Sequence, residues 1–387
     1  MKNKAKLFYK LKEKDSFYLQ SRKLLSFADY QSNDYFIGSA SYNIAYYFDI
    51  MNRKFDSAFY YYNYSKKAFL KCKDTANAGR KLLNAGVIQT EMNDFFGAKE
   101  TLTSAVYLLT KGKDTNFLAA SYNQLGTCYK ELNDFKNAKL LYNKAIALST
   151  SNKNLLSYKN NLGIFYSDLG DFKKADSIIT SIVPEAKSIA SKRTYLRILH
   201  NHYYFQWKKN KLNVEQNLLS ILNSRKRIND NKGIITSHID IAEFYLNNLP
   251  QKAIKHLDTS VSLAKISGSP KRETKALEIL MKIEPNNIIH KNRYIFLRDS
   301  LYQNELNAKH QFSYMIYQDQ QEKERLLQLE AETAQQEAKL VQKENQRIML
   351  FSFVGLFLIG GVWYYQSQKQ RYKKEKQEEV RATEERI

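Results

Sequence analysis

Side chains suited to acid–base, nucleophilic or metal chemistry are scattered along this sequence. His200 and His202 form the closest histidine pair, and two residues apart on a helix they point to different faces. Cys72 and Cys128 lie far apart without metal-ligand spacing, and their pattern leaves open whether they meet as a disulfide. No glycine-rich phosphate loop, zinc-binding helix or nucleophile elbow occurs in the sequence. We therefore expect no catalytic residues, no metal site, no cofactor and no enzymatic activity.

Amide side chains point to recognition instead of catalysis. Asn43, Asn123 and Asn160 share one offset in stretches that begin at residues 39, 119 and 156, and Lys130 lies nearby. Asparagines spaced in this way can hydrogen-bond the backbone of an extended peptide without strong selection for its sequence. We predict that these four residues bind a partner. The alternative is that the asparagines cap or bridge neighbouring helices, and the sequence leaves both possibilities open.

These asparagines belong to an internal repeat that must position them. Four stretches align: "YNIAYYFDIMNRKFDSAFYYYN", "LLNAGVIQTEMNDFFGAKETLTSAV", "YNQLGTCYKELNDFKNAKLLYNKAI" and "NNLGIFYSDLGDFKKADSII". The equivalent residues Tyr46, Gly86, Gly126 and Gly163 are separated by 40, 40 and 37 residues. Such regular spacing predicts one supersecondary unit repeated along the chain.

The unit that begins at residue 79 interrupts the series of asparagines. At the equivalent positions it carries Arg80, Leu83 and Val87. These side chains weaken the prediction of an uninterrupted hydrogen-bonding ladder.

Each unit has the properties of two antiparallel helices. Gly86, Gly126 and Gly163 allow the second helix of a unit to pack closely against the first, and "NDF" or "GDF" forms the turn between them. Asn or Gly can adopt the positive φ that a tight turn requires, and Asp can cap the following helix. We therefore predict an all-α solenoid in which aromatic side chains fill the space between units.

This pattern resembles the tetratricopeptide repeat, TPR, over most of residues 5 to 300, although the standard repeat has 34 residues and these units are longer. The motif is nearly lost around "LHNHYYFQWKKNKLNVEQNLL" and returns in "IDIAEFYLNNLPQKAIKHLDTSVSLA". The resemblance implies a repeat array over residues 1–300 whose concave face binds a peptide or protein partner.

Composition and charge agree with a helical binding protein. Only 4 Pro and 13 Gly occur among 387 residues, which disfavours turn-rich all-β folds. The net charge is +22, but the basic residues alternate with acids and aromatics along the chain. Because no concentrated basic block or nucleic-acid-binding module occurs, we expect no direct nucleic-acid binding by this chain.

A heptad seam follows the repeat region, over residues 301–347. Residues at alternating spacings of four and three form it: Leu327, Ala331, Ala334, Ala338, Val341 and Asn345. This pattern predicts a coiled-coil homodimer, which the alanines weaken and in which Asn345 would fix the register. The alternative is a single solvated helix stiffened by Glu and Lys pairs.

Residues 348–366, "IMLFSFVGLFLIGGVWYYQ", form an apolar stretch without a charge. Roughly 18 residues at 1.5 Å per residue are about 27 Å long, which matches the hydrocarbon core of a bilayer. Trp363, Tyr364 and Tyr365 gather at one end, where aromatic rings favour the headgroup region. We predict a transmembrane helix and regard a buried core helix as the alternative.

Flanking charges set the expected orientation of this span. The basic residues that follow it are Lys369, Arg371, Lys373, Lys374, Lys376, Arg381 and Arg386, against Lys339, Lys343 and Arg347 before it. The positive-inside rule then places the basic helical tail, residues 367–387, in the cytoplasm and the repeats in the periplasm, with the span in the inner membrane. The basic first residues lack an apolar leader core. Either the chain starts further upstream, which we favour, or it is tail-anchored and cytoplasmic.

The complete layout is similar to the sensor half of a bacterial membrane signalling family. In that family an extracytoplasmic TPR domain is joined through one transmembrane helix to a histidine kinase or a helix-turn-helix regulator. "RATEERI" resembles the segment that leads into the phosphoacceptor helix of such kinases, although no output domain occurs in this sequence. The resemblance implies a receptor or sensor subunit of a two-component signal transduction system. The alternative is a membrane-tethered scaffold that gathers proteins without signalling.

Overall fold

Helices account for every regular element in the computed structural model, which describes residues 2–384. Their bounds are α1 Lys2–Leu11, α2 Lys14–Tyr30, α3 Asp34–Tyr46, the π-helix η1 Tyr47–Asn52, α4 Phe55–Lys71, α5 Thr75–Glu91, α6 Phe95–Lys111, α7 Thr115–Glu131 and α8 Phe135–Leu148. They continue with α9 Asn152–Asp168, α10 Phe172–Ile189, α11 Lys192–Asn210, α12 Glu215–Arg227, α13 Asn231–Tyr245, α14 Pro250–Ile266, α15 Pro270–Ile283 and α16 Ile288–Glu384. The predicted all-α solenoid is confirmed.

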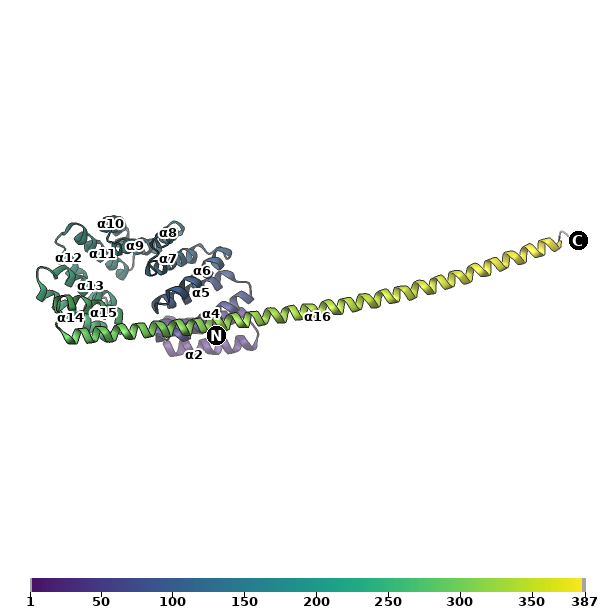
Figure 1. Ribbon diagram of the computed structural model, residues 1–387, viewed down its shortest axis with the longest axis horizontal. Coiled ribbons are helices and arrows are strands. Elements are labelled where there is room, and N and C mark those ends of the chain that lie inside the picture. The colour runs from purple at the N-terminus through teal and green to yellow at the C-terminus, as the bar shows by residue number, and fades with distance from the viewer. Residues whose placement is uncertain (1, 385–387) are drawn as a thin grey trace. The chain divides into compact units, whose positions relative to one another are not determined.

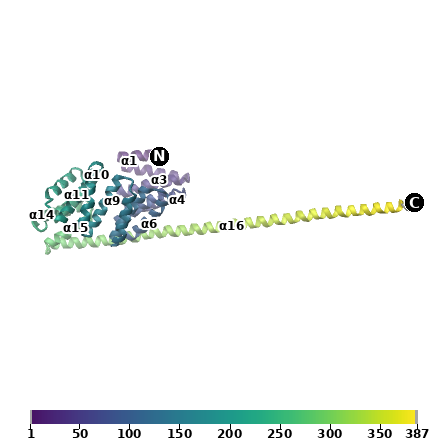
Figure 2. The same ribbon diagram turned by 90° about the horizontal axis from the view of Figure 1, so that it is seen from above.

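Two compact units divide the chain, one up to Met315 and the other from Ile316 onward. In the first unit, helices from α1 to α15 pack in sequence order against their neighbours (Figures 1 and 2). Figure 1 shows α5, α7, α9, α11, α13 and α15 on the inside of the curve and the helices between them on the outside. We call the side formed by these six helices the inner face.

Local sequence explains where the repeat helices begin. Asp94, Asp134 and Asp171 each accept a hydrogen bond from the backbone N–H three residues later, as N-caps of α6, α8 and α10. The residue directly before each of these caps has a positive φ. The angle is 67° at Asn93, 61° at Asn133 and 77° at Gly170. The turns predicted from "NDF" and "GDF" are therefore confirmed.

Close packing within a unit depends on its glycines. A Cβ atom added at Gly86 would lie 2.6 Å from Cγ of Leu102, and one added at Gly163 would lie 2.9 Å from two side-chain carbons of Ile179. Both distances are below ordinary carbon contact, so a larger side chain at these positions would push the paired helices apart.

The π-helix η1 adds one residue to the first repeat, which α3 and α4 form. Gly38 packs against Phe69 of α4, and Gly79 packs against Leu109 of α6, so the first helices are offset by 41 residues and the second helices by 40. A π-turn accommodates such an extra residue without ending the helix. By this register Asn43 is equivalent to Asn84 instead of Leu83, which differs by one from the alignment made on sequence alone.

Helix α16 runs without a break from Ile288 to Glu384. By length and composition, one segment within Leu327–Arg381 could cross a membrane, and none of its apolar window is buried. This exposure argues against the alternative of a buried core helix. Residues 385–387, with Arg386 and the end of "RATEERI", lie outside the described part of the chain.

Candidate functional site

Side-chain amides join successive helices of the inner face. Nδ2 of Asn161 on α9 donates to Oδ1 of Asn123 on α7 at 3.1 Å, and Nδ2 of Asn201 on α11 donates to Oδ1 of Asn160 on α9 at 2.9 Å. Asn123 is 5% exposed and Asn160 is 0% exposed. Both predicted asparagines therefore bridge neighbouring repeats in this structure.

The same pattern continues one repeat further with a histidine and an aspartate. Nε2 of His200 on α11 lies 2.7 Å from Oδ2 of Asp240 on α13, and both side chains are buried. We call the six residues of these three contacts the polar ladder: Asn123, Asn161, Asn160, Asn201, His200 and Asp240. The ladder covers α7, α9, α11 and α13, which are four successive helices of the inner face.

Two members of the polar ladder are half-buried and reach the surface of the array. Asn161 and Asn201 each use the amide nitrogen to hold the preceding helix. Within residues 2–384, their Oδ1 atoms accept no side-chain hydrogen bond, so each can accept one from a ligand N–H. The prediction from the repeat alignment did not include Asn161 or Asn201, although the adjacent pair Asn160 and Asn161 indicated a second amide at this position.

The other two predicted partner-binding residues, Asn43 and Lys130, do not belong to the polar ladder. Asn43 is half-buried on α3. Nζ of Lys130 lies 2.8 Å from Oδ2 of Asp168 and 3.0 Å from Oε1 of Glu131. Burial alone would lower the pKa of Lys130, but the hydrogen bond to Asp168 and the negative charge of Asp168 raise it. This lysine is therefore a charged group that joins α7 to α9.

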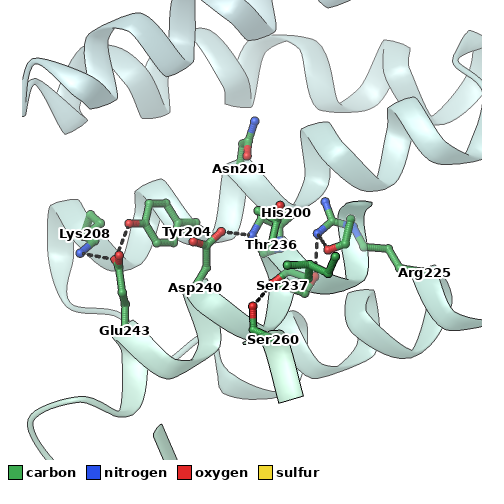
Figure 3. Close-up of polar contacts among 12 residues, drawn as sticks. His200, Asn201, Tyr204, Lys208, Arg225, Thr236, Ser237, Asp240, Glu243 and Ser260 are labelled. Carbon is green, nitrogen blue, oxygen red and sulfur yellow. Dashed lines mark hydrogen bonds and ion pairs between the residues drawn. The ribbon is translucent and has the colours of Figure 1, made fainter. Parts of the chain in front are cut away.

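Beside the ladder, a second polar cluster joins α11 to α13 (Figure 3). The hydroxyl of Tyr204 donates to Oε2 of Glu243 at 2.7 Å, and Nζ of Lys208 lies 3.1 Å from the same oxygen. Burial, followed by the nearby charges of Asp240 and Glu243, raises the pKa of Tyr204. The hydroxyl of Tyr204 therefore stays protonated and acts as a hydrogen-bond donor.

The buried His200–Asp240 pair consists of a neutral ring and a carboxylate. Burial lowers the pKa of His200, although Asp240 acts in the opposite direction. Burial alone would raise the pKa of Asp240, but the hydrogen bond from His200 lowers it. Because the ionised carboxylate can only accept a hydrogen bond, Nε2 carries the proton of the neutral ring and Nδ1 is unprotonated. This hydrogen-bonded pair joins α11 to α13.

The histidines and cysteines singled out in the sequence lie in separate surroundings. His202 Nδ1 lies 3.1 Å from Oγ1 of Thr180 on α10, whereas His200 faces α13, so the prediction that the pair points to different faces is confirmed. Cys72 is an exposed free thiol and Cys128 a buried one, so they do not form a disulfide here. Burial raises the pKa of Cys128 to about 11.

Heptad-seam residues lie on α16, in the unit from Ile316 onward. All six are exposed in the single chain: Leu327, Ala331, Ala334, Ala338, Val341 and Asn345. Their apolar side chains therefore have no cover from this part of the described chain, and the coiled-coil dimer stays a prediction.

The chain is similar to known proteins in one stretch of its sequence and in its fold. Residues 119–152 match the model of the tetratricopeptide repeat. A search of curated proteins gave no match. The chain is similar to the crystal structure of the apo form of RapI, with a TM-score of 0.58 and 13% identity over 68% of this chain and 95% of that one.

A second similar structure is that of a Rap protein complexed with Competence and Sporulation Factor. Its TM-score is 0.55, with 13% identity over 76% of this chain and 87% of that chain. At this identity the likeness shows the fold alone. The matched repeat and the two similar solenoids together support a TPR-type protein.

Proposed function

We propose that this chain is a membrane-anchored TPR receptor that binds a peptide or protein segment on its inner face. The observation that carries the proposal is the continuity of α16. This one helix contributes Leu297 to the core of the array and also contains the apolar segment that could cross a membrane. A helix that belongs to both parts can pass a displacement from the array to the segment beyond it.

Hydrogen-bonding groups on the inner face suit an extended peptide. Asn161 and Asn201 offer carbonyl oxygens from adjacent helices, while Asn123 and Asn160 hold them in place. We propose that Asn43 and Lys130 extend the contact surface toward α3 and α7. The similar Rap structure was determined with Competence and Sporulation Factor, which supports a bound factor as the occupant of a solenoid of this kind.

Sensor function requires that two copies act together at the membrane. The exposed seam on α16 supports a homodimer, because its apolar positions need a partner surface. The basic residues after the apolar stretch support a single-pass inner-membrane protein with a cytoplasmic C-terminus and a periplasmic array. We propose that the chain is the non-catalytic sensor part of a bacterial signal transduction system.

A random peptide library displayed on phage tests the binding function. The full chain is reconstituted in nanodiscs, and enriched peptides are measured by calorimetry. We expect Asn161→Ala with Asn201→Ala to weaken binding at least tenfold, because each lost hydrogen bond contributes about 1 kcal/mol. Asn143→Ala on the outer helix α8 is the matched control, because Asn143 is exposed and lies outside the inner face. Equal losses in both variants, or no enrichment of any peptide, would contradict the proposed site.

A further inference from the structure

An unexpected aromatic residue marks the first repeat. In the three repeats that follow the first, the second helix has a buried alanine near its start, and the residue after it is Lys99 in α6, Lys139 in α8 and Asp176 in α10. In α4 the equivalent residue is Phe59, which is only 1% exposed. This position is charged in those three repeats and is the half-buried Ile254 in α14, so the nearly complete burial of Phe59 indicates a cover specific to the first repeat.

The cover is an aromatic residue from α16. Phe312 is also 1% exposed, and its ring centroid lies 4.5 Å from that of Phe59. Its neighbours Gln311 and Ser313 are exposed, whereas Ala308, one turn earlier, is buried. Ala308 and Phe312 therefore form an apolar patch on a polar helix, and Phe312 packs against Phe59 of the first repeat.

At its start, α16 is attached to the opposite end of the array. Nε and Nη2 of Arg293 lie 2.6 and 3.1 Å from the two carboxylate oxygens of Glu273 on α15, and Glu273 is buried. Leu297 belongs to the hydrophobic core formed with α13, α14 and α15. From Leu297 to Phe312 the helix rises about 22 Å, so one rigid segment joins the last repeat to the first.

Another contact within the array joins the last repeat to the second repeat. Nζ of Lys271, at the start of α15, donates to Oδ1 of Asn93, in the turn between α5 and α6 and 178 residues away. Glu91, Glu131 and Glu305 provide negative charge around this lysine. The array is therefore held closed between its late and early repeats by two separate contacts.

We propose that residues 288–315 of α16 form a strap across the two ends of the array and that ligand binding on the inner face changes the strap contact at Phe59 and Phe312. The proposal rests on the proposed function, because the ligand is the one that occupies the inner face. A ligand that alters the curvature of the array changes the distance between its ends. Because the strap continues as the same helix beyond Met315, its displacement is the first step of signal output.

Spin labels placed across the strap test the contact without any ligand. The full chain in nanodiscs, with Cys72→Ser to remove the exposed thiol, carries labels at Tyr60→Cys on α4 and Ser313→Cys on α16, both of which are exposed positions. We expect one narrow distance distribution. Phe312→Ala should raise the detached population at least tenfold, because truncating a buried aromatic removes most of this contact.

Two controls separate loss of the contact from general unfolding. Tyr302→Ala truncates an exposed aromatic of the same helix and should leave the distribution unchanged. Phe312→Leu keeps apolar volume and should give an intermediate population. If Phe312→Ala leaves the distance distribution narrow and unshifted, the strap is refuted.

Adding a peptide selected from the phage library tests the coupling. At saturation we expect the peptide to shift the 60–313 distance distribution, and Phe312→Ala to change the affinity of the peptide at least threefold. A peptide that binds but leaves both unchanged refutes the coupling while the binding function stands. If no peptide binds, the proposed function fails together with the coupling, and the ligand-free distances still decide whether the strap exists.

Discussion

The array up to Met315 and the helical segment from Ile316 to Glu384 differ in the burial of their apolar side chains. In the array, residues such as Leu102 and Ile179 are fully buried against the preceding helix, and glycines of that helix allow the approach. In the segment, every large apolar side chain from Ile348 to Tyr365 is exposed. Burial of apolar surface is the main source of stability. The array therefore contains its own core, whereas the apolar side chains of the segment have no cover within the described chain, which agrees with the proposed membrane span.

Charges in the apolar segment should give the largest effect. Leu356→Arg with Ile359→Arg places two cations near the middle of the span, at an expected cost of about 6 kcal/mol for membrane insertion. We expect the variant to move from the membrane fraction to the alkaline-soluble fraction in carbonate extraction.

The array of the same double variant should keep its helical circular dichroism, because its core does not include the span. Leu356→Ala with Ile359→Ala is the matched control and should stay in the membrane fraction. A double-arginine variant that remains in the membrane would show that the segment does not anchor the chain.

Truncation of a leucine should distinguish the two regions by stability. Leu102→Ala in the array removes a side chain that is fully buried beside Gly86, and we expect a loss of about 3 kcal/mol in the free energy of unfolding. Leu350→Ala in the apolar segment should change it by less than about 0.5 kcal/mol, because Leu350 is exposed in the chain. Urea titration of the full chain in nanodiscs, followed by circular dichroism, measures both. Equal losses would remove the distinction between the two regions.

Acidification should weaken the array through its buried histidines. Nδ1 of His238 on α13 lies 2.9 Å from Nδ1 of His256 on α14, and burial, followed by the charges of His256 and Lys226, lowers the pKa of His238 to about 4. The unfolded chain binds a proton near pH 6.5, so it binds more protons than the folded chain between pH 6.5 and pH 4. Stability contributed by His238 is therefore present above pH 6.5 and is lost as the pH falls through this window.

The expected loss between pH 7 and pH 5 is about 2 kcal/mol for His238, measured by urea titration at each pH. His238→Phe should reduce this pH dependence. His310→Gln, which replaces an exposed histidine of α16, should leave it intact. If His238→Phe retains the full pH dependence, another group causes it.

Sequence predicted the repeats well because their signals are local. The turn residues Asn93, Asn133 and Gly170 adopt positive φ, and the aspartate that follows each of them caps a helix, so both effects depend on adjacent residues alone. The weak motif near residue 200 still forms the pair α11 and α12, because apolar periodicity persists there.

Contacts between repeats were harder to predict from sequence. The partners Asn161, Asn201 and Asp240 are each offset by one position from the residue equivalent to their neighbour, which depends on how successive helices rotate. The π-helix moved Asn43 by one further residue. The contact of Phe59 with Phe312 joins the first repeat to α16. The sequence indicated this contact by a phenylalanine at a position where the next three repeats carry a charge.

Distance measurement between the two C-terminal tails of a dimer tests the central claim most directly. The full chain in nanodiscs, with Cys72→Ser, carries a spin label at Lys373→Cys, and a library-selected peptide is added. The account predicts that the peptide shifts the distance between the labels, and that inserting two residues after Ala338 abolishes the shift, whereas inserting one heptad of seven preserves it. A peptide that binds without changing the distance between the tails would contradict a receptor and identify a tether.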